Sequence, residues 1–288
     1  MSAAAGATSD ALVAGAAIAT RRILRFGPDE RFVGILTGSP AASNAPVLLL
    51  PSAGLQPRSG PFRLHVELGE RLAAAGLRTF RFDAPGVGEA PRVTGFDARA
   101  ATIAAMDLLQ KQHGVSKFAV GGICSAADIG WNTAMADERV SALLLLDGIA
   151  FTGPWFSYAR WLDRLRRVPT EWRRMLRDAR PPGRGGDGNG MGSADFRDWP
   201  THEEAKAQFA KLVARRTRML WIYTGGYTDR FLHLRQFRWA FGTPASDPCV
   251  EALYWPDCDH TFYARAHRDR LIDQVKAWLL GLGSGAGG

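Results

Sequence analysis

The stretch Phe118-Ala-Val-Gly-Gly-Ile-Cys-Ser-Ala-Ala-Asp128 runs from a short apolar strand through a sharp turn into the start of a helix. Such a turn, the nucleophile elbow, projects one reactive side chain and leaves almost no room two positions before and after it. Gly122 and Ala126 meet this requirement around Cys124, whereas centring the turn on Ser125 would put an isoleucine at a crowded position. The stretch therefore favours Cys124 as the projecting residue. A small cysteine packed between strand and helix is the other interpretation.

Short apolar strands alternate with helical stretches along most of the remaining chain. Strands are predicted at residues 45–50, 77–82, 117–121, 140–146, 219–223 and 250–255, and helices at 62–75, 98–113 and 269–280. An antiparallel hairpin is predicted before them, at residues 23–37. This alternation predicts an α/β fold with a mostly parallel central sheet and helices on both of its faces.

One long segment, residues 150–206, breaks the alternation with aromatic residues, basic helices and a Gly-rich stretch. An insertion of this size between two core strands is expected to form a helical lid. The domain prediction is an N-terminal extension of low order (1–19), a core (20–149 and 207–281), a basic lid (150–206) with a flexible stretch (181–193), and a disordered tail (282–288).

Composition and charge narrow the class of protein. The 288 residues are 46% hydrophobic and carry a net charge of +8. Much of the positive charge comes from arginines at residues 160–184, which form either a solvated helix face or a cationic rim for an anionic substrate. No zinc-finger or RNP-type motif accompanies them, so nucleic-acid binding is not expected. No apolar run approaches the ~20 residues of a membrane span. We expect a cytoplasmic protein.

Cysteine usage fits a reducing compartment. The three cysteines, Cys124, Cys249 and Cys258, cannot all pair, and they lack the CxxC spacing of a structural zinc site. We therefore expect free thiols, with no metal and no cofactor.

A thiol at an elbow needs a base, and the base needs an orienting acid. Both are expected on loops that follow the carboxyl ends of later strands. Asp229 follows the strand at 219–223, and His260 follows the strand at 250–255. The chain order nucleophile, acid, histidine predicts a triad of Cys124, Asp229 and His260.

Backbone donors for a developing oxyanion are predicted beside the thiol. The N–H of Ser125 lies at the helix start, and a second N–H is expected from Leu55, just past Gly54. The alternative is that residues 52–54 form only a tight turn.

Weaker candidates for substrate contacts come from two places. His65 follows the oxyanion loop and either faces the pocket or lies on a helix surface. Trp155, Phe156 and Tyr158 either line an apolar pocket under the lid or form ordinary lid core. Asp128, one turn into the elbow helix, is expected to have a structural role, with helix-start N–H groups or an arginine as partner.

Together these motifs resemble those of α/β-hydrolases. The resemblance covers residues 20–149 and 207–281 and includes the elbow, the Asp83-x-x-Gly86-x-Gly88 turn, and the loops of Asp229 and His260. The stretches 52–65 and 122–128 also resemble bacterial hydrolase-like proteins associated with exosortase and exopolysaccharide gene clusters, which place cysteine at the elbow. That resemblance implies that the sulfur is native to the site. The chain departs from ordinary esterases in lacking His-Gly in the oxyanion loop and serine at the elbow.

The predicted reaction is acyl transfer from an ester or thioester through an acyl-enzyme, by a hydrolase, thioesterase or acyltransferase. The basic lid suits a donor carried by coenzyme A or by a carrier protein. A lyase or cyclase that uses only the His–Asp pair, and a non-catalytic binding protein, are the alternatives. A homodimer is left open.

Overall fold

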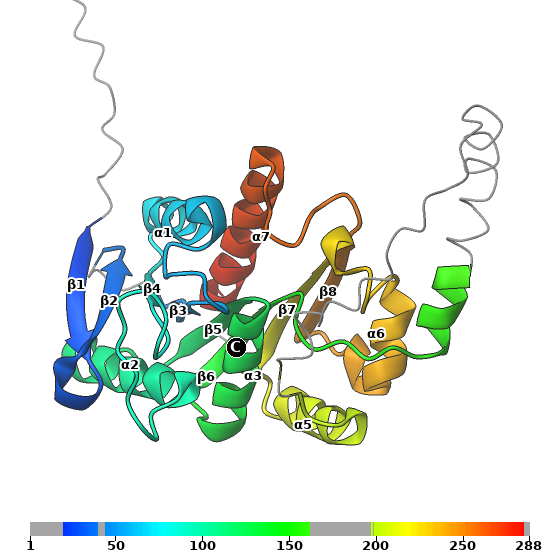
Figure 1. Ribbon diagram of the computed structural model, residues 1–288, viewed down its shortest axis with the longest axis horizontal. Coiled ribbons are helices and arrows are strands. Elements are labelled where there is room, and N and C mark those ends of the chain that lie inside the picture. The colour runs from blue at the N-terminus through cyan, green and yellow to red at the C-terminus, as the bar shows by residue number, and fades with distance from the viewer. Residues whose placement is uncertain (1–19, 40–43, 162–196, 198, 285–288) are drawn as a thin grey trace, which may run out of the picture.

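The computed structural model describes residues 20–39, 44–161, 197 and 199–284. Within them, eight strands form one sheet in the order β1-β2-β4-β3-β5-β6-β7-β8 (Figure 1). β1 (Arg21–Phe26) and β2 (Phe32–Thr37) form the predicted antiparallel hairpin, and β2 also runs antiparallel to β4 (Thr79–Phe82). The remaining pairings are all parallel. From β4 the neighbours follow one another as β3 (Val47–Pro51), β5 (Phe118–Ile123), β6 (Val140–Leu146), β7 (Arg218–Thr224) and β8 (Val250–Trp255).

Helices cover both faces of this sheet, which confirms the predicted fold class. α1 (Leu64–Ala74) and α7 (Arg265–Ser284) pack on one face. The other face is covered by α2 (Ala98–His113), α3 (Ser125–Ala136), α5 (His202–Ala214) and α6 (Leu234–Phe241). These two layers lie on opposite sides of the strands in Figure 1. The strands between them are buried on both faces and therefore read as continuous apolar runs.

The helices dock because their apolar side chains recur with helical spacing. In α1, Leu64, Leu68 and Leu72 lie four residues apart, on one face, and all are buried. In α3, the Trp131 ring packs edge-on against Trp221 of β7 and stacks with Phe209 of α5. This packing holds α3, and with it the elbow, against the sheet.

Two predicted boundaries differ from the structure. α5 begins at His202, and Ala205 is already buried in the core, so the core resumes before residue 207. α7 continues to Ser284, into the segment predicted as a disordered tail. Four of the predicted segments lie wholly or partly outside the described residues. They are the N-terminal extension (1–19), the flexible stretch (181–193), most of the lid and the end of the tail. None of the helices in the described part of the chain is long and apolar enough to cross a membrane.

Gly121 and the backbone of β6 approach each other too closely for a side chain. A Cβ atom on Gly121 would lie 2.0 Å from the Leu144 carbonyl oxygen, and Gly121 has φ 143°.

We expect Gly121→Ala to lower the free energy of unfolding by about 3 kcal/mol or more, because backbone strain and overpacking against β6 add. Gly114→Ala is the matched control: it also has positive φ but nothing lies within 4 Å of its Cβ position. The control should cost about 1 to 2 kcal/mol in urea unfolding; equal losses in the two variants would contradict the expectation.

Candidate active site

The turn between β5 and α3 has the geometry of a nucleophile elbow. Cys124 has φ 56° and ψ −121°, a conformation that is strained for a residue with a side chain. Gly122 has φ 148°, and a Cβ atom added to it would lie 3.1 Å from the Ala126 Cβ. The turn therefore requires small residues at these two positions. The residue held at the apex is Cys124, and Ser125 begins the helix.

His260 is paired with Asp147, which directly follows β6. Asp147 is 0% exposed, and its Oδ2 lies 2.7 Å from His260 Nδ1. Its carboxylate also accepts hydrogen bonds from the Thr224 N–H and hydroxyl, both at 2.7 Å. A carboxylate only accepts, so Nδ1 of His260 carries the proton that it donates to Asp147. The imidazole also hydrogen-bonds the side chain of Cys124, which joins the three residues in one chain of hydrogen bonds.

Electrostatics favour a charged pair of Cys124 and His260. Burial alone would raise the pKa of the Cys124 thiol, but its hydrogen bond with His260 and the charge of Arg197 outweigh burial and hold that pKa below its ordinary value. Burial also works to lower the pKa of His260, yet the hydrogen bonds and charges of Asp147 and Cys124 raise it to about 10. Both shifts stabilise a thiolate beside an imidazolium.

The prediction that Asp229 orients His260 is wrong. The Asp229 side chain is 61% exposed, and its carboxylate lies 3.9 Å from Arg230. The loop after β7 first forms a 3-10 turn (Gly225–Tyr227), which leads the chain away from the strand end before Asp229 is reached. Asp147 was visible in the sequence as the residue that closes the strand at 140–146, and this strand-end position is the signal that could have identified it.

The glycine pair in the predicted Asp229 loop has a packing role instead. A Cβ atom on Gly225 would lie 2.0 Å from the Pro256 carbonyl oxygen, and one on Gly226 would lie 2.3 Å from the His260 backbone nitrogen. These glycines let the loop after β7 pack directly against the loop that carries His260.

The loop after β3 contacts the elbow, as expected, but through Gly54. The Gly54 N–H donates to the Ser125 hydroxyl at 2.7 Å, and the Ser125 N–H hydrogen-bonds the Cys124 side chain. Leu55 as a whole is 90% exposed. The backbone N–H groups of Leu55 and Ser125 remain predicted oxyanion donors.

Two further residues at the site were not predicted. Arg197 lies behind the elbow, with its guanidinium against Asp128 and the Cys124 carbonyl oxygen. Asp128 thereby has the arginine partner that was one of its expected partners. The ring of Tyr227 is stacked on that of His260, at 6.1 Å between centroids and 20° between planes. Burial raises the pKa of Tyr227. Neither residue lies in a recognisable motif. The one available hint of Arg197 is Asp128, an acid one turn into the elbow helix for which an arginine partner was expected.

The weaker candidates have mixed outcomes. His65 is buried in α1 beneath the Gly60 turn, and burial lowers its pKa to about 4, so it is a neutral packing residue and the predicted substrate contact is wrong. Residues 154–161 are helical and pack on α6, where Arg235 lies over the Trp155 ring. Tyr158 is exposed and stacks with Trp161.

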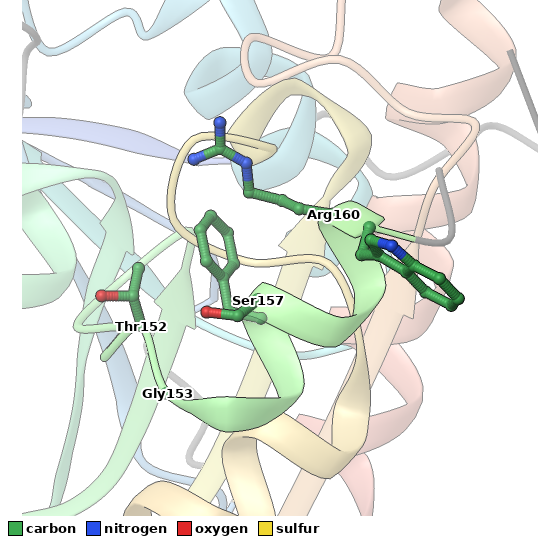
Figure 2. A pocket seen from close by; sticks show the side chains of 6 residues that line it. Thr152, Gly153, Ser157 and Arg160 are labelled. Atoms are coloured by element: carbon green, nitrogen blue, oxygen red, sulfur yellow. The ribbon is translucent and has the colours of Figure 1, made fainter. Parts of the chain in front are cut away.

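Phe156 contributes to a cavity on this helical segment. The cavity has a volume of about 590 Å³ and is lined by Thr152, Gly153, Phe156, Ser157, Arg160 and Trp161 (Figure 2). In Figure 2, Thr152 and Gly153 lie on the loop that leads into the helix, and Ser157 and Arg160 lie on the helix itself. No residue of the Cys124–His260–Asp147 chain lines it. An apolar substrate pocket formed by Trp155, Phe156 and Tyr158 thus stays a prediction.

One cluster among the described residues has donor atoms suited to a metal ion. Ligand atoms of Asp257, Cys258 and His267 lie within 4.8 Å of one another. The Arg270 guanidinium already lies 3.2 Å from the Asp257 carboxylate, and its positive charge opposes a second cation. We assign no metal to this cluster.

The fold and the site can be compared with known proteins. A family model described as the alpha/beta hydrolase fold matches residues 46–223. A protein of unknown function from Agrobacterium tumefaciens is 13% identical with a TM-score of 0.59, covering 93% of this chain and 98% of its own. An alpha-beta serine hydrolase homologue from Coxiella burnetii is 13% identical with a TM-score of 0.54, covering 91% and 96%. The thioesterase domain from the curacin biosynthetic pathway is 16% identical with a TM-score of 0.52, covering 91% and 99%.

The match to the family model spans more than half of the chain. The protein therefore belongs to the α/β-hydrolase fold family. A search of curated protein sequences finds no match to it.

The two aspartates can be separated by substitution. Asp147→Asn should lower kcat/KM for an activated ester about 100-fold or more, because an amide no longer selects the imidazole tautomer that faces the sulfur. Asp229→Asn is the matched control and should leave kcat/KM within about twofold, because its side chain faces solvent. Urea unfolding of both proteins checks that they are folded. Loss of activity in Asp229→Asn alone would reverse the assignment.

The thiols should differ in reactivity. Iodoacetamide should modify Cys124 well before Cys249 and Cys258 near neutral pH, because burial raises the pKa of each of the latter to about 11. The midpoint of the rate profile for Cys124 should lie below the ordinary pKa of a thiol. In His260→Ala the midpoint should move upward, since the lowering hydrogen bond is lost. Peptide mass spectrometry across a pH series measures this, and equal labelling of the three thiols would contradict it.

Proposed function

We propose that this protein is an acyl-transfer enzyme that acts on an ester or thioester through an acyl-enzyme on Cys124. The observation that supports this most is the hydrogen-bonded chain of Cys124, His260 and Asp147 at the carboxyl ends of β5, β8 and β6. A nucleophile beside a base, with the base oriented by a buried acid, is the arrangement that covalent acyl transfer requires.

The first half of the reaction forms the acyl-enzyme. The Cys124 thiolate attacks the carbonyl carbon, and the carbonyl π electrons move to oxygen. Backbone N–H groups, for which Ser125 and Leu55 are the predicted donors, stabilise that oxyanion. The carbonyl then re-forms as the bond to the leaving group breaks, and the His260 imidazolium gives its proton to the departing alcohol or thiol. The product is an acyl thioester on Cys124 and a neutral imidazole.

The second half releases the acyl group. His260 takes a proton from water, and the resulting hydroxide equivalent attacks the thioester carbonyl. Collapse of the tetrahedral intermediate expels the Cys124 thiolate, releases the acid and restores the imidazolium. An alcohol or amine in place of water gives acyl transfer to that acceptor. Throughout, Asp147 holds His260 in one tautomer and stabilises its positive charge.

The chemistry of sulfur favours thioester substrates over oxygen esters. Attack of a thiolate on a thioester exchanges one carbon–sulfur bond for another and is therefore nearly isoenergetic. The motif resemblance to hydrolase-like proteins of exosortase and exopolysaccharide clusters supports the use of sulfur here. A donor carried by coenzyme A or a carrier protein is part of this proposal, although most of the arginines predicted to attract it lie outside the described residues.

Trapping of the intermediate tests the proposal. Incubation with short acyl-CoA thioesters and with p-nitrophenyl esters should add one acyl group to the peptide that contains Cys124, seen by mass spectrometry after rapid acid quench. Turnover of the thioesters should exceed that of the oxygen esters.

Two variants distinguish the competing reactions. Cys124→Ala should be inactive with all acyl donors, whereas Cys124→Ser should retain measurable activity because a hydroxyl can still attack with His260 as base. Full activity of Cys124→Ala with loss in His260→Ala would refute acyl-enzyme chemistry and favour a lyase. Absence of both turnover and adduct with every donor would favour a binding protein.

A further inference from the structure

The guanidinium of Arg197 forms more hydrogen bonds than a single ion pair would supply. Its Nε and Nη2 form a two-pronged pair with Asp128, at 2.5 and 2.6 Å. Its second Nη2 hydrogen points to the Cys124 carbonyl oxygen at 3.1 Å. Its Nη1 donates to the Asp147 carbonyl oxygen at 3.1 Å and to the Tyr227 hydroxyl at 3.2 Å. These contacts use all five N–H donors of a guanidinium.

The groups that receive these bonds belong to the site. Cys124 and Asp147 follow β5 and β6, and Tyr227, which follows β7, is stacked on His260. One buried side chain (4% exposed) therefore joins three neighbouring strand ends at the place where the hydrogen-bonded chain is assembled. A planar fork is needed for this, because a lysine ammonium has three donors at one point.

The buried ion pair of Arg197 and Asp128 is not explained by stability alone. A buried ion pair loses its hydration, and an apolar pair of similar volume is often as stable or more stable. The strained backbone of Cys124, in contrast, must be held in place by its surroundings. The Cys124 carbonyl is one of the groups that Arg197 holds.

We propose that Arg197 is a positioning residue that holds the Cys124 elbow against the strand ends of Asp147 and Tyr227 and places its charge beside the elbow. This inference rests on the proposed role of Cys124 as nucleophile. The groups around the sulfur are His260 and Asp147 from the loops after β8 and β6, Asp128 of α3, Tyr227 after β7, and Arg197. The charge of Arg197 lowers the pKa of the thiol, so loss of Arg197 must shift thiolate formation to higher pH.

The pH dependence of Cys124 alkylation tests this without any substrate. In Arg197→Met the midpoint of the iodoacetamide rate profile should rise by about one pH unit, and the rate near neutral pH should fall about tenfold. Arg197→Lys should show a smaller rise, since its charge remains. The matched control is Arg215→Met, because Arg215 also donates to a carbonyl of α3, that of Ala134, at 2.8 Å but at the other end of the helix. Its profile should equal that of the wild type.

Folding of the variants does not limit the test. If Arg197→Met leaves Asp128 unpaired and fails to fold, the double variant Arg197→Met/Asp128→Asn removes both charges. Its midpoint should still rise, but by less than in Arg197→Met, because loss of the Asp128 carboxylate works in the opposite direction. A folded variant of either kind whose alkylation profile superimposes on the wild-type profile overturns the proposal. A wild type that forms no acyl adduct would refute the proposed function alone, because alkylation reports the thiol itself.

Discussion

The carboxylate of Asp147 is the group on which the arrangement of the site depends. With no solvent contact, its oxygens must be satisfied by the protein, and Thr224 and His260 supply three hydrogen bonds. These bonds tie the end of β6 to the end of β7 and to the loop after β8. The same carboxylate determines which nitrogen of His260 carries the proton, and so which nitrogen faces the thiol. Sheet geometry, tautomer and thiol ionisation are therefore coupled through one buried acid.

A thiol in place of a hydroxyl changes the protonation state in which the neighbouring histidine begins the reaction. A serine hydroxyl must lose its proton during attack, so its base has to be neutral beforehand. In this site the pKa of Cys124 is lowered and that of His260 is raised, which favours proton transfer before a substrate arrives. In the proposed mechanism the imidazolium then acts first as the acid that protonates the leaving group. The rate of that mechanism thus depends on expulsion of the leaving group as well as on attack.

Much of the fold could be predicted from the sequence, because buried parallel strands and amphipathic helices have distinct patterns. The elbow was also accessible, since only small residues fit around Cys124. The aspartate that pairs with His260 could not be predicted. Asp147 and Asp229 both follow a strand, and hydrophobic periodicity does not show how the loop after a strand bends. The 3-10 turn of residues 225–227 carries Asp229 to the surface, while Asp147 stays at the strand end. Arg197 could not be predicted either, because its partners are brought together only by folding: the Asp128 carboxylate, the Tyr227 hydroxyl and two backbone carbonyls.

The position of Arg197 limits how the segment between β6 and β7 can be exchanged. Connecting segments vary more among homologues than core strands do. The segment between β6 and β7 could therefore be taken for a unit that can be exchanged between homologues without affecting the core. Here Arg197, near the end of the segment, lies behind Cys124 and bonds three core loops. A chimaera that replaced residues 150–200 without an equivalent arginine would leave the partly buried Asp128 without its counter-charge. Exchange of this segment would therefore also change the surroundings of Cys124, and a junction that preserves them lies N-terminal to Arg197.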